Sequence, residues 1–259
     1  MTHSLTYRRI LSRMGYYAYQ NGLIYNHLNQ EGGWDGHLAC CRNFIMKTLE
    51  YYKPSRVTVL GSGWLLDLPL AEMLEKTEMI YLADIVHPPE VIRQAGELGR
   101  VVLVEQDITG GLIEEIWNAA GNFSFFRKLK SLGSISMPEF VPAFDPGVVI
   151  SLNILTQLES RLVEWLKKRS DLGEEQLLSF RKSIQEKHIE FLLKNKSVLI
   201  TDYEEVVTKK TGEVNNISTL LVTLPQSHLR EEWTWDFDLT GHENYNSRSV
   251  IKVLAMTLG

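Results

Sequence analysis

The stretch of this chain that most constrains its fold runs from Val57 to Leu70 and reads VTVLGSGWLLDLPL. β-branched and aliphatic residues lead into Gly61-Ser62-Gly63, and leucines follow at helical spacing. This pattern predicts a strand over 57–60, a tight glycine turn, and a helix from about Leu65 to Lys76. Glycines let the backbone approach a ligand closely, and a helix N-terminus binds anions. The stretch therefore predicts the first strand–turn–helix unit of a doubly wound sheet.

Three further predicted strands end in polar side chains. The strand over 79–84 ends in Asp84, which lies 23 residues after Gly61. The strand over 100–105 leads into Gln106-Asp107, and the apolar run 148–152 leads into Asn153. Ligands of open α/β sheets bind at the carboxyl ends of the strands. In dinucleotide-type folds, an acid about 20 residues after the glycines binds the ribose hydroxyls. These residues therefore predict a nucleoside site.

The rest of the chain completes an α/β pattern. Helical patterns cover 88–98, 111–120 and two segments between 158 and 191, and a fifth strand is predicted over 197–201. The last two strands, over 233–238 and 249–258, enclose only a polar loop, which predicts an antiparallel hairpin. We expect a doubly wound, mostly parallel seven-stranded sheet that ends in this hairpin. Residues 209–216 are expected to form a polar loop, and 220–224 fit either a strand or a helix.

The N-terminal region carries no strand pattern, and we expect it to form a helical cap over 1–54, with one or two short helices and then a helix over 37–52. The main domain is expected over 55–259. Two aromatic groups have alternative interpretations, either ligand contact or plain packing. The first lies in the cap, and the second lies in a long insertion over 121–147 that reads as a lid or a mobile loop. They are Tyr16, Tyr17, Tyr19 and Tyr25, and Phe123, Phe125 and Phe126.

Composition narrows the class of protein. A chain with 44% hydrophobic and 23% charged residues is typical of a globular protein with a sizeable core. A net charge of −5 argues against nucleic acid as the main partner, although a local basic patch is compatible with it. The adjacent Cys40 and Cys41 have no metal-type spacing, so we expect no metal and a reducing compartment. Without an apolar signal core or a membrane span, the expected location is cytoplasmic, and the oligomeric state stays open.

Five strand–helix units followed by a terminal hairpin resemble the class I S-adenosyl-L-methionine-dependent methyltransferases, and the resemblance covers residues 55–259. It implies that S-adenosyl-L-methionine is the cofactor. Gly61, Ser62 and Gly63 match the glycine motif that contacts the methionine part, and Asp84 matches the acid that binds the ribose. By the same resemblance, Gln106 and Asp107 lie beside the adenine, and Asn153 borders the methyl group and the substrate.

Two positions depart from the family pattern. Val59 stands where the family usually has an acid, and Leu65 stands where it usually has a third glycine. Asp67 is a candidate replacement for the missing acid, although the predicted helix would contain it. Leu66 also occupies a position that the dinucleotide fingerprint GxGxxG reserves for glycine, which weakens an NAD interpretation.

These observations favour a methyltransferase that transfers the methyl group in line to an oxygen or nitrogen of a small molecule. A small-molecule acceptor is favoured because the net charge is negative and the N-terminal cap is rich in aromatic residues. The chain lacks an Asp/Asn-Pro-Pro-Tyr motif after the fourth strand, which disfavours methylation of adenine or glutamine amides in that style. The alternatives are a methyltransferase-like binding protein without activity, an RNA or protein methyltransferase that uses Arg8, Arg9 and Arg13, and an NAD-dependent oxidoreductase.

Methyl transfer to a good nucleophile requires no base, because the cofactor supplies the electrophile and the protein supplies proximity and alignment. If the acceptor does require a base, the candidates are His188, His37 and Glu204. His188 falls on the apolar stripe of its predicted helix, which equally suits a buried structural histidine. His37 opens a helix and equally suits a cap, and Glu204 follows the fifth strand.

Overall fold

The computed structural model describes residues 3–30, 32–121, 128–241 and 247–259. In this part of the chain eight strands form one sheet in the order β3-β2-β1-β4-β5-β8-β7, with β6 paired to β5. The strands are β1 (Arg56–Leu60), β2 (Met79–Asp84), β3 (Val101–Glu105), β4 (Val148–Leu152), β5 (Ser197–Lys209), β6 (Val214–Ser218), β7 (Arg230–Asp238) and β8 (Ser247–Leu258). The helices are α1 (Leu5–Met14), α2 (Tyr16–Asn29), α3 (Asp35–Tyr52), α4 (Leu70–Lys76), α5 (Pro89–Gly96), α6 (Leu112–Gly121), α7 (Ser160–Arg169) and α8 (Glu174–Leu193).

The sheet has the predicted doubly wound architecture. Strands β1 to β5 pair in parallel, whereas β8 runs antiparallel to both β5 and β7. The chain winds outward from β1 to β3 and then returns to β4 on the other side of β1, so the winding direction switches between β1 and β4. Ligands of such sheets bind at this switch point. The predicted mostly parallel sheet with a terminal antiparallel hairpin is confirmed.

The central strands of the sheet are buried on both faces, which explains their continuous apolar runs. Alternate residues of β4 enter two different cores: Val149 packs with α6, α7 and α8, whereas Ile150 packs with α3 and α4. Helix α3 contributes Phe44 and Ile45 to the second core, so it packs directly on the sheet. The division into residues 1–54 and 55–259 stays a prediction.

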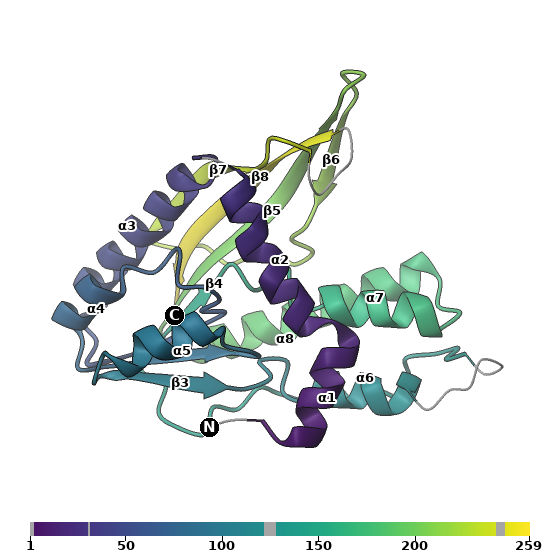
Figure 1. Ribbon diagram of the computed structural model, residues 1–259, viewed down its shortest axis with the longest axis horizontal. Coiled ribbons are helices and arrows are strands. Elements are labelled where there is room, and N and C mark those ends of the chain that lie inside the picture. Colours follow the sequence, from purple (N-terminus) through teal and green to yellow (C-terminus); the bar gives the residue numbers. More distant parts are fainter. Residues whose placement is uncertain (1–2, 31, 122–127, 242–246) are drawn as a thin grey trace.

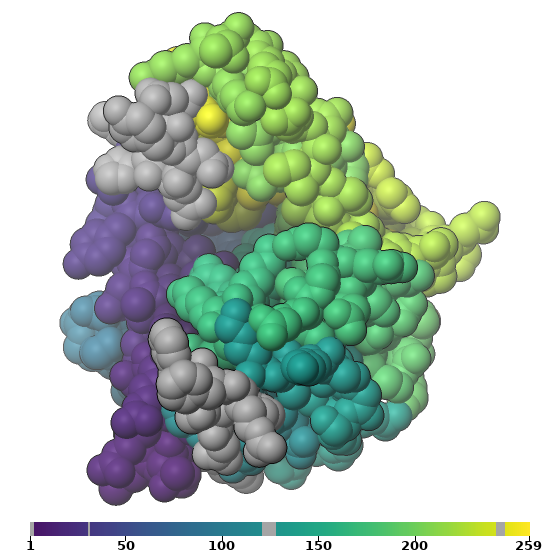
Figure 2. Space-filling view, turned by 90° about the vertical axis from the view of Figure 1, so that its right-hand side faces the viewer, coloured from purple at the N-terminus to yellow at the C-terminus, as the bar shows by residue number. Residues whose placement is uncertain are grey.

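Helices α1 and α2 precede the sheet in the chain, and α1 contributes Ile10, Leu11 and Met14 to the first of these cores. The purple column in Figure 2 contains both helices, and α1 contacts α6 and α7. Ser4 caps α1 by accepting a hydrogen bond from the backbone N–H of Tyr7, and Gly15 ends the helix in the left-handed conformation that favours glycine. The expectation of one or two short N-terminal helices is met by α1 and α2.

The helix after the glycine turn begins later than predicted. It starts at Leu70 instead of Leu65. Leu65 adopts a left-handed backbone conformation with φ of 61°, and Pro69 occupies the position before the first helical residue. Both conformations interrupt a right-handed helix, so residues 61–69 form a loop. Asp67 therefore lies in this loop and not in a helix.

Strand β5 is longer than the predicted strand over 197–201. The strand continues to Lys209 because residues 204–208 pair with β6 on one side and with β8 on the other. Strands β5 and β6 form a hairpin, and the segment 209–216, expected to be a loop, contains its turn and the first residues of β6. Strand β6 is thus an additional, eighth strand of the sheet. Side chains in this part of β5 are half-buried and β6 is exposed, so no apolar alternation marks either segment. This end of the sheet extends away from the helices (Figure 1).

The long segment before β4 is irregular in its described part, residues 128–147, apart from an isolated bridge between Leu129 and Ser170. Phe140 from this segment is buried against Phe191 of α8. Phe123, Phe125 and Phe126 lie outside the described residues, and the interpretation of this segment as a lid stays a prediction. Residues 220–224 form neither a helix nor a strand. Among the described helices, none is both long and apolar enough to span a bilayer.

The first testable prediction concerns Gly61, where β1 ends beside β4. Its φ is 82°, and a Cβ there would lie 2.7 Å from the Cβ of Ile154 and 2.9 Å from the carbonyl oxygen of Leu152. We expect Gly61→Ala to lower the free energy of unfolding by about 3 kcal/mol or more, because the clash adds to the backbone strain. Urea denaturation measures this change.

The matched control is Gly212→Ala in the β5–β6 turn. Gly212 has a similar φ of 86°, but no atom lies within 4 Å of its Cβ position. This variant should lose only about 1 kcal/mol from backbone strain. Equal losses in the two variants would contradict a tight contact between the loops after β1 and β4.

Candidate functional site

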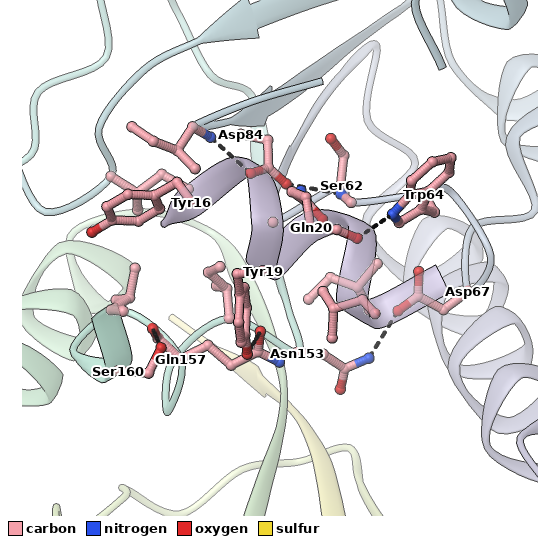
Figure 3. Close-up of a pocket in the computed structure, with 18 of the residues that line it drawn as sticks. Tyr16, Tyr19, Gln20, Ser62, Trp64, Asp67, Asp84, Asn153, Gln157 and Ser160 are labelled. Atoms are coloured by element: carbon pink, nitrogen blue, oxygen red, sulfur yellow. Dashed lines mark hydrogen bonds between the residues drawn. The ribbon is translucent and has the colours of Figure 1, made fainter. Parts of the chain in front are cut away.

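A pocket lies at the switch point of the sheet, with an empty volume of about 1100 Å³ that includes its open mouth. The loops after β1, β2, β3 and β4 form its floor, and α2 crosses it (Figure 3). The start of α3 and Trp235 of β7 close one end. All seven residues predicted to bind the cofactor line this pocket: Gly61, Ser62, Gly63, Asp84, Gln106, Asp107 and Asn153.

Asp84 lies at the end of β2 and faces the glycine loop. Its carboxylate accepts hydrogen bonds from the backbone N–H of Gly63 at 2.8 Å and of Ile85 at 2.7 Å. Burial raises the pKa of this carboxyl, while the charge of His87 and the backbone N–H donors oppose the rise. These bonds leave part of the acceptor capacity of an ionised carboxylate unused, and Asp84 lines the pocket.

Asp107 is more fully engaged by the protein. Its carboxylate accepts from the backbone N–H and the hydroxyl of Thr109, from the N–H of Ile113 at 3.3 Å, and from the hydroxyl of Tyr7 at 3.2 Å. Four donors match the acceptor capacity of a carboxylate, so this acid caps α6 and ties α1 to the sheet edge. Its neighbour Gln106 donates to the carbonyl of Val141. The predicted contacts of both residues with adenine stay predictions.

Asp67 and Asn153 join the loops that follow β1 and β4. The amide Nδ2 of Asn153 donates a hydrogen bond of 2.8 Å to the carboxylate of Asp67 (Figure 3). Asn153 adopts a left-handed conformation with φ of 49°, which asparagine tolerates better than most residues. Burial raises the pKa of Asp67 to about 6. The switch point thus holds an acid that comes from neither the end of β2 nor that of β3.

His37, from the first turn of α3, lies at the same end of the pocket. It is 1% exposed, and its ring stacks on Trp235 with centroids 3.9 Å apart. The indole Nε1–H of Trp233 donates a hydrogen bond of 3.1 Å to His37 Nδ1. Because an indole nitrogen only donates, Nδ1 must be unprotonated, and the proton of the neutral ring lies on Nε2. Burial lowers the pKa of His37 to about 3, so the ring stays neutral.

This tautomer decides whether the cluster suits a metal ion. A ring nitrogen of His37, the sulfur of Cys41 and a carboxylate oxygen of Asp67 lie within 4.8 Å of one another. A metal-bound histidine needs a free lone pair on one nitrogen and an acceptor for the proton on the other. Here Trp233 occupies the lone pair of Nδ1 and Nε2 carries the proton, so His37 does not fit as a ligand. Burial also raises the pKa of Cys41, which keeps its thiol protonated.

The other two candidate bases lie outside this pocket. His188 is buried on α8, where its Nε2 lies 2.8 Å from the hydroxyl of Ser151 on β4, and burial lowers its pKa to about 4. Glu204 lies within β5 and forms an ion pair with Lys252 of β8 at 2.5 Å. Of the three candidates, the structure brings only His37 to the predicted cofactor residues.

Helix α2 contributes side chains that the sequence pattern only partly indicated. Tyr16 and Gln20 lie one turn apart, and both line the pocket (Figure 3). Among the described residues, the Tyr16 hydroxyl and Gln20 Oε1 are buried without a hydrogen-bond partner, as is the hydroxyl of Ser62 opposite them. The group of tyrosines in the sequence indicated Tyr16 as a possible ligand contact. Nothing in the pattern marked Gln20 or Trp64, whose Nε1–H donates to the Gln20 carbonyl oxygen at 2.7 Å.

Comparison with known proteins gave similar solved structures only. No protein-family model and no curated protein matches the chain. It is similar to the 1,6-didemethyltoxoflavin-N1-methyltransferase of Burkholderia thailandensis with bound 1,6-didemethyltoxoflavin and S-adenosylhomocysteine, with 11% identity over 100% of this chain and 92% of that chain, at a TM-score of 0.41.

Two further similar structures contain S-adenosylhomocysteine. One is DhpI, with 10% identity over 96% of this chain and 97% of that chain, at a TM-score of 0.36. The other is the N-methyltransferase NodS from Bradyrhizobium japonicum WM9, with 10% identity over 83% and 85%, at a TM-score of 0.32. The strand order of this chain, with its reversed β8, is that of the class I methyltransferase fold.

The second testable prediction uses the raised pKa of Asp67. A half-buried acid whose pKa rises from 3.8 to about 6 stabilises the fold while protonated, and this contribution is lost as the pH rises between about 4 and 6. Asp67→Asn keeps the shape and removes the charge. We therefore expect the variant to match the wild type near pH 4 and to exceed its free energy of unfolding by about 2 kcal/mol at pH 7.

Urea denaturation of both proteins between pH 4 and 7 measures this difference. The other buried acids are present in both proteins, so their contributions cancel. A difference between the two proteins that stays constant over this range would contradict a raised pKa of Asp67.

Proposed function

We propose that this protein is an S-adenosyl-L-methionine-dependent methyltransferase that acts on an oxygen or nitrogen of a small molecule. The observation that carries the proposal is the position of Asp67. The class I pattern usually has an acid just before the glycine turn, and this chain has Val59 at that position. The loop over 61–69 brings Asp67 to the pocket beside Asn153, where it supplies the missing negative charge.

In this proposal, different polar groups of the pocket bind different parts of the cofactor. Asp84 offers carboxylate oxygens to the ribose hydroxyls, and Asp67 offers one to the ammonium of the methionine part. The apolar side chains of Ile108 and Ile113 line the pocket near Tyr16 and suit an adenine ring. The unpartnered Ser62 hydroxyl, Tyr16 hydroxyl and Gln20 Oε1 provide further hydrogen bonds to a polar ligand.

In methyl transfer, a bond forms between the acceptor atom and the methyl carbon while the carbon–sulfur bond of the sulfonium breaks, and its electron pair stays on sulfur. The residues of this chain would align the two reactants and exclude water. His37 does not supply a base, because Trp233 uses its Nδ1 lone pair and Nε2 already carries a proton. The acceptor atom is therefore proposed to be nucleophilic without a histidine base.

A small acceptor is favoured by the cover over the pocket. Helix α2 crosses the site, and the hydroxyl of its Tyr19 donates a hydrogen bond of 3.0 Å to Oε1 of Gln157, which also lines the pocket (Figure 3). The backbone of α2 is also tied to the glycine loop through Trp64. A nucleic acid or a protein would have to displace this helix to reach the cofactor.

The third testable prediction is the binding of the cofactor. We expect calorimetric titration to give micromolar binding of S-adenosyl-L-methionine and S-adenosylhomocysteine, and no comparable binding of NAD. Asp84→Asn and Asp67→Asn should each weaken S-adenosyl-L-methionine binding by about tenfold or more, because each removes a charged hydrogen bond to the ligand. The matched control is Asp171→Asn, an exposed acid outside the pocket, which should bind as the wild type does.

Each alternative function has its own result in this experiment. Binding of NAD alone would favour the oxidoreductase and overturn the proposal. Absence of binding for all three ligands would leave the binding protein without methyltransferase activity as the better account. Loss of affinity in Asp84→Asn but not in Asp67→Asn would show that Asp67 does not replace the missing acid.

A further inference from the structure

The environment of His37 Nε2 lacks a strong hydrogen-bond acceptor. With its proton on Nε2, the ring faces the amide Nδ2 of Asn153 at 3.2 Å, and Nδ2 is also a donor. The sulfur of Cys41 lies 3.5 Å from Nε2 but accepts only weakly. One N–H of Asn153 is used by Asp67. Within the described part of the chain, the donors of His37 and Asn153 thus converge on a place where an acceptor is missing.

A single uncharged acceptor atom satisfies this arrangement. A carbonyl oxygen has two lone pairs and can accept from both His37 and Asn153. A carboxylate or a phosphate is disfavoured, because both donors are neutral groups, and an anion buried without a cationic partner carries a large desolvation cost. A cation is disfavoured by the two converging donors themselves.

The walls beside these donors are aromatic and well fixed. Trp34 meets Trp235 edge to face with centroids 4.8 Å apart, and its Nε1–H donates to the carbonyl of Phe237 at 3.0 Å. Trp34, Trp235 and His37 all line the pocket. Rigid aromatic faces favour a flat ligand, since they bury its rings without changing shape.

We propose that the methyl acceptor is a flat, uncharged heteroaromatic molecule that presents a carbonyl oxygen or ring nitrogen to the Nε2–H of His37, held as a donor by Trp233. His37 is then a positioning and specificity residue and not the base. The inference rests on the proposed function, because it assigns this end of the pocket to the acceptor.

The fourth testable prediction measures the binding of simple probes by saturation-transfer NMR with S-adenosylhomocysteine present. The probes are 2-pyridone, which has a ring carbonyl, benzoate, benzylammonium and toluene. We expect 2-pyridone to bind best. His37→Phe should weaken it about tenfold, because one hydrogen bond to a buried donor is lost, while toluene binds equally to both proteins. His228→Phe, at an exposed histidine outside the pocket, is the matched control and should change nothing.

A second variant keeps the inference testable if the new phenylalanine of His37→Phe impairs folding. Trp233→Phe keeps an aromatic ring on β7 but removes the N–H that fixes the tautomer. In ¹⁵N-histidine spectra, we expect His37 to be protonated on Nε2 alone in the wild type and on a mixture of both nitrogens in Trp233→Phe. The affinity for 2-pyridone should fall severalfold in this variant as the donor becomes partly lost.

The outcomes separate this inference from the proposed function. Preference for benzoate or benzylammonium, binding of none of the four probes, or an unchanged affinity for 2-pyridone in both variants would overturn the inference. A wild-type His37 protonated on Nδ1 would overturn it as well. If S-adenosylhomocysteine fails to bind but 2-pyridone still binds best and is weakened by the variants, the proposed function would be overturned. The assignment of His37 and Asn153 as donors to a neutral acceptor would then still hold.

Discussion

The site depends on the contact between the loops that follow β1 and β4. These strands are neighbours in the sheet, and the winding direction of the chain switches between them. Gly61 permits the close approach, and the hydrogen bond from Asn153 to Asp67 joins the two loops across the switch point. Without this contact, Asp67, which we propose to replace the acid missing at Val59, would have no fixed position, and the proposed cofactor site would lack its charge.

The second structural requirement is the packing of α3 against β7. It places His37 between Trp233 and Trp235, residues far away in sequence. One indole donates to the ring and the other stacks on it, so the orientation and the tautomer of His37 are both determined by the C-terminal hairpin. A helix that reads as part of an N-terminal cap thereby contributes a pocket residue whose chemistry is set by the last strands of the sheet.

Much of the fold could be predicted from the sequence, because buried parallel strands have continuous apolar runs and glycine or polar residues mark their ends. The edge residues Gly61, Asp84 and Asn153 were found in this way, and they do meet in one pocket. The position of Asp67 could not be read, because the left-handed Leu65 interrupts what looks like a helical leucine pattern. The roles of Trp233 and Gln20 depend on contacts between distant segments, which no local pattern records.

The most direct measurement for the central claim is a crystal structure of the protein grown with S-adenosylhomocysteine. The account predicts the ligand in the pocket under α2, with its ribose hydroxyls on Asp84 and its ammonium within hydrogen-bond distance of Asp67. It also predicts that Nε2 of His37 stays free to face an acceptor molecule. A ligand whose amino-acid end lies away from Asp67, or an empty pocket at saturating ligand, would contradict the account.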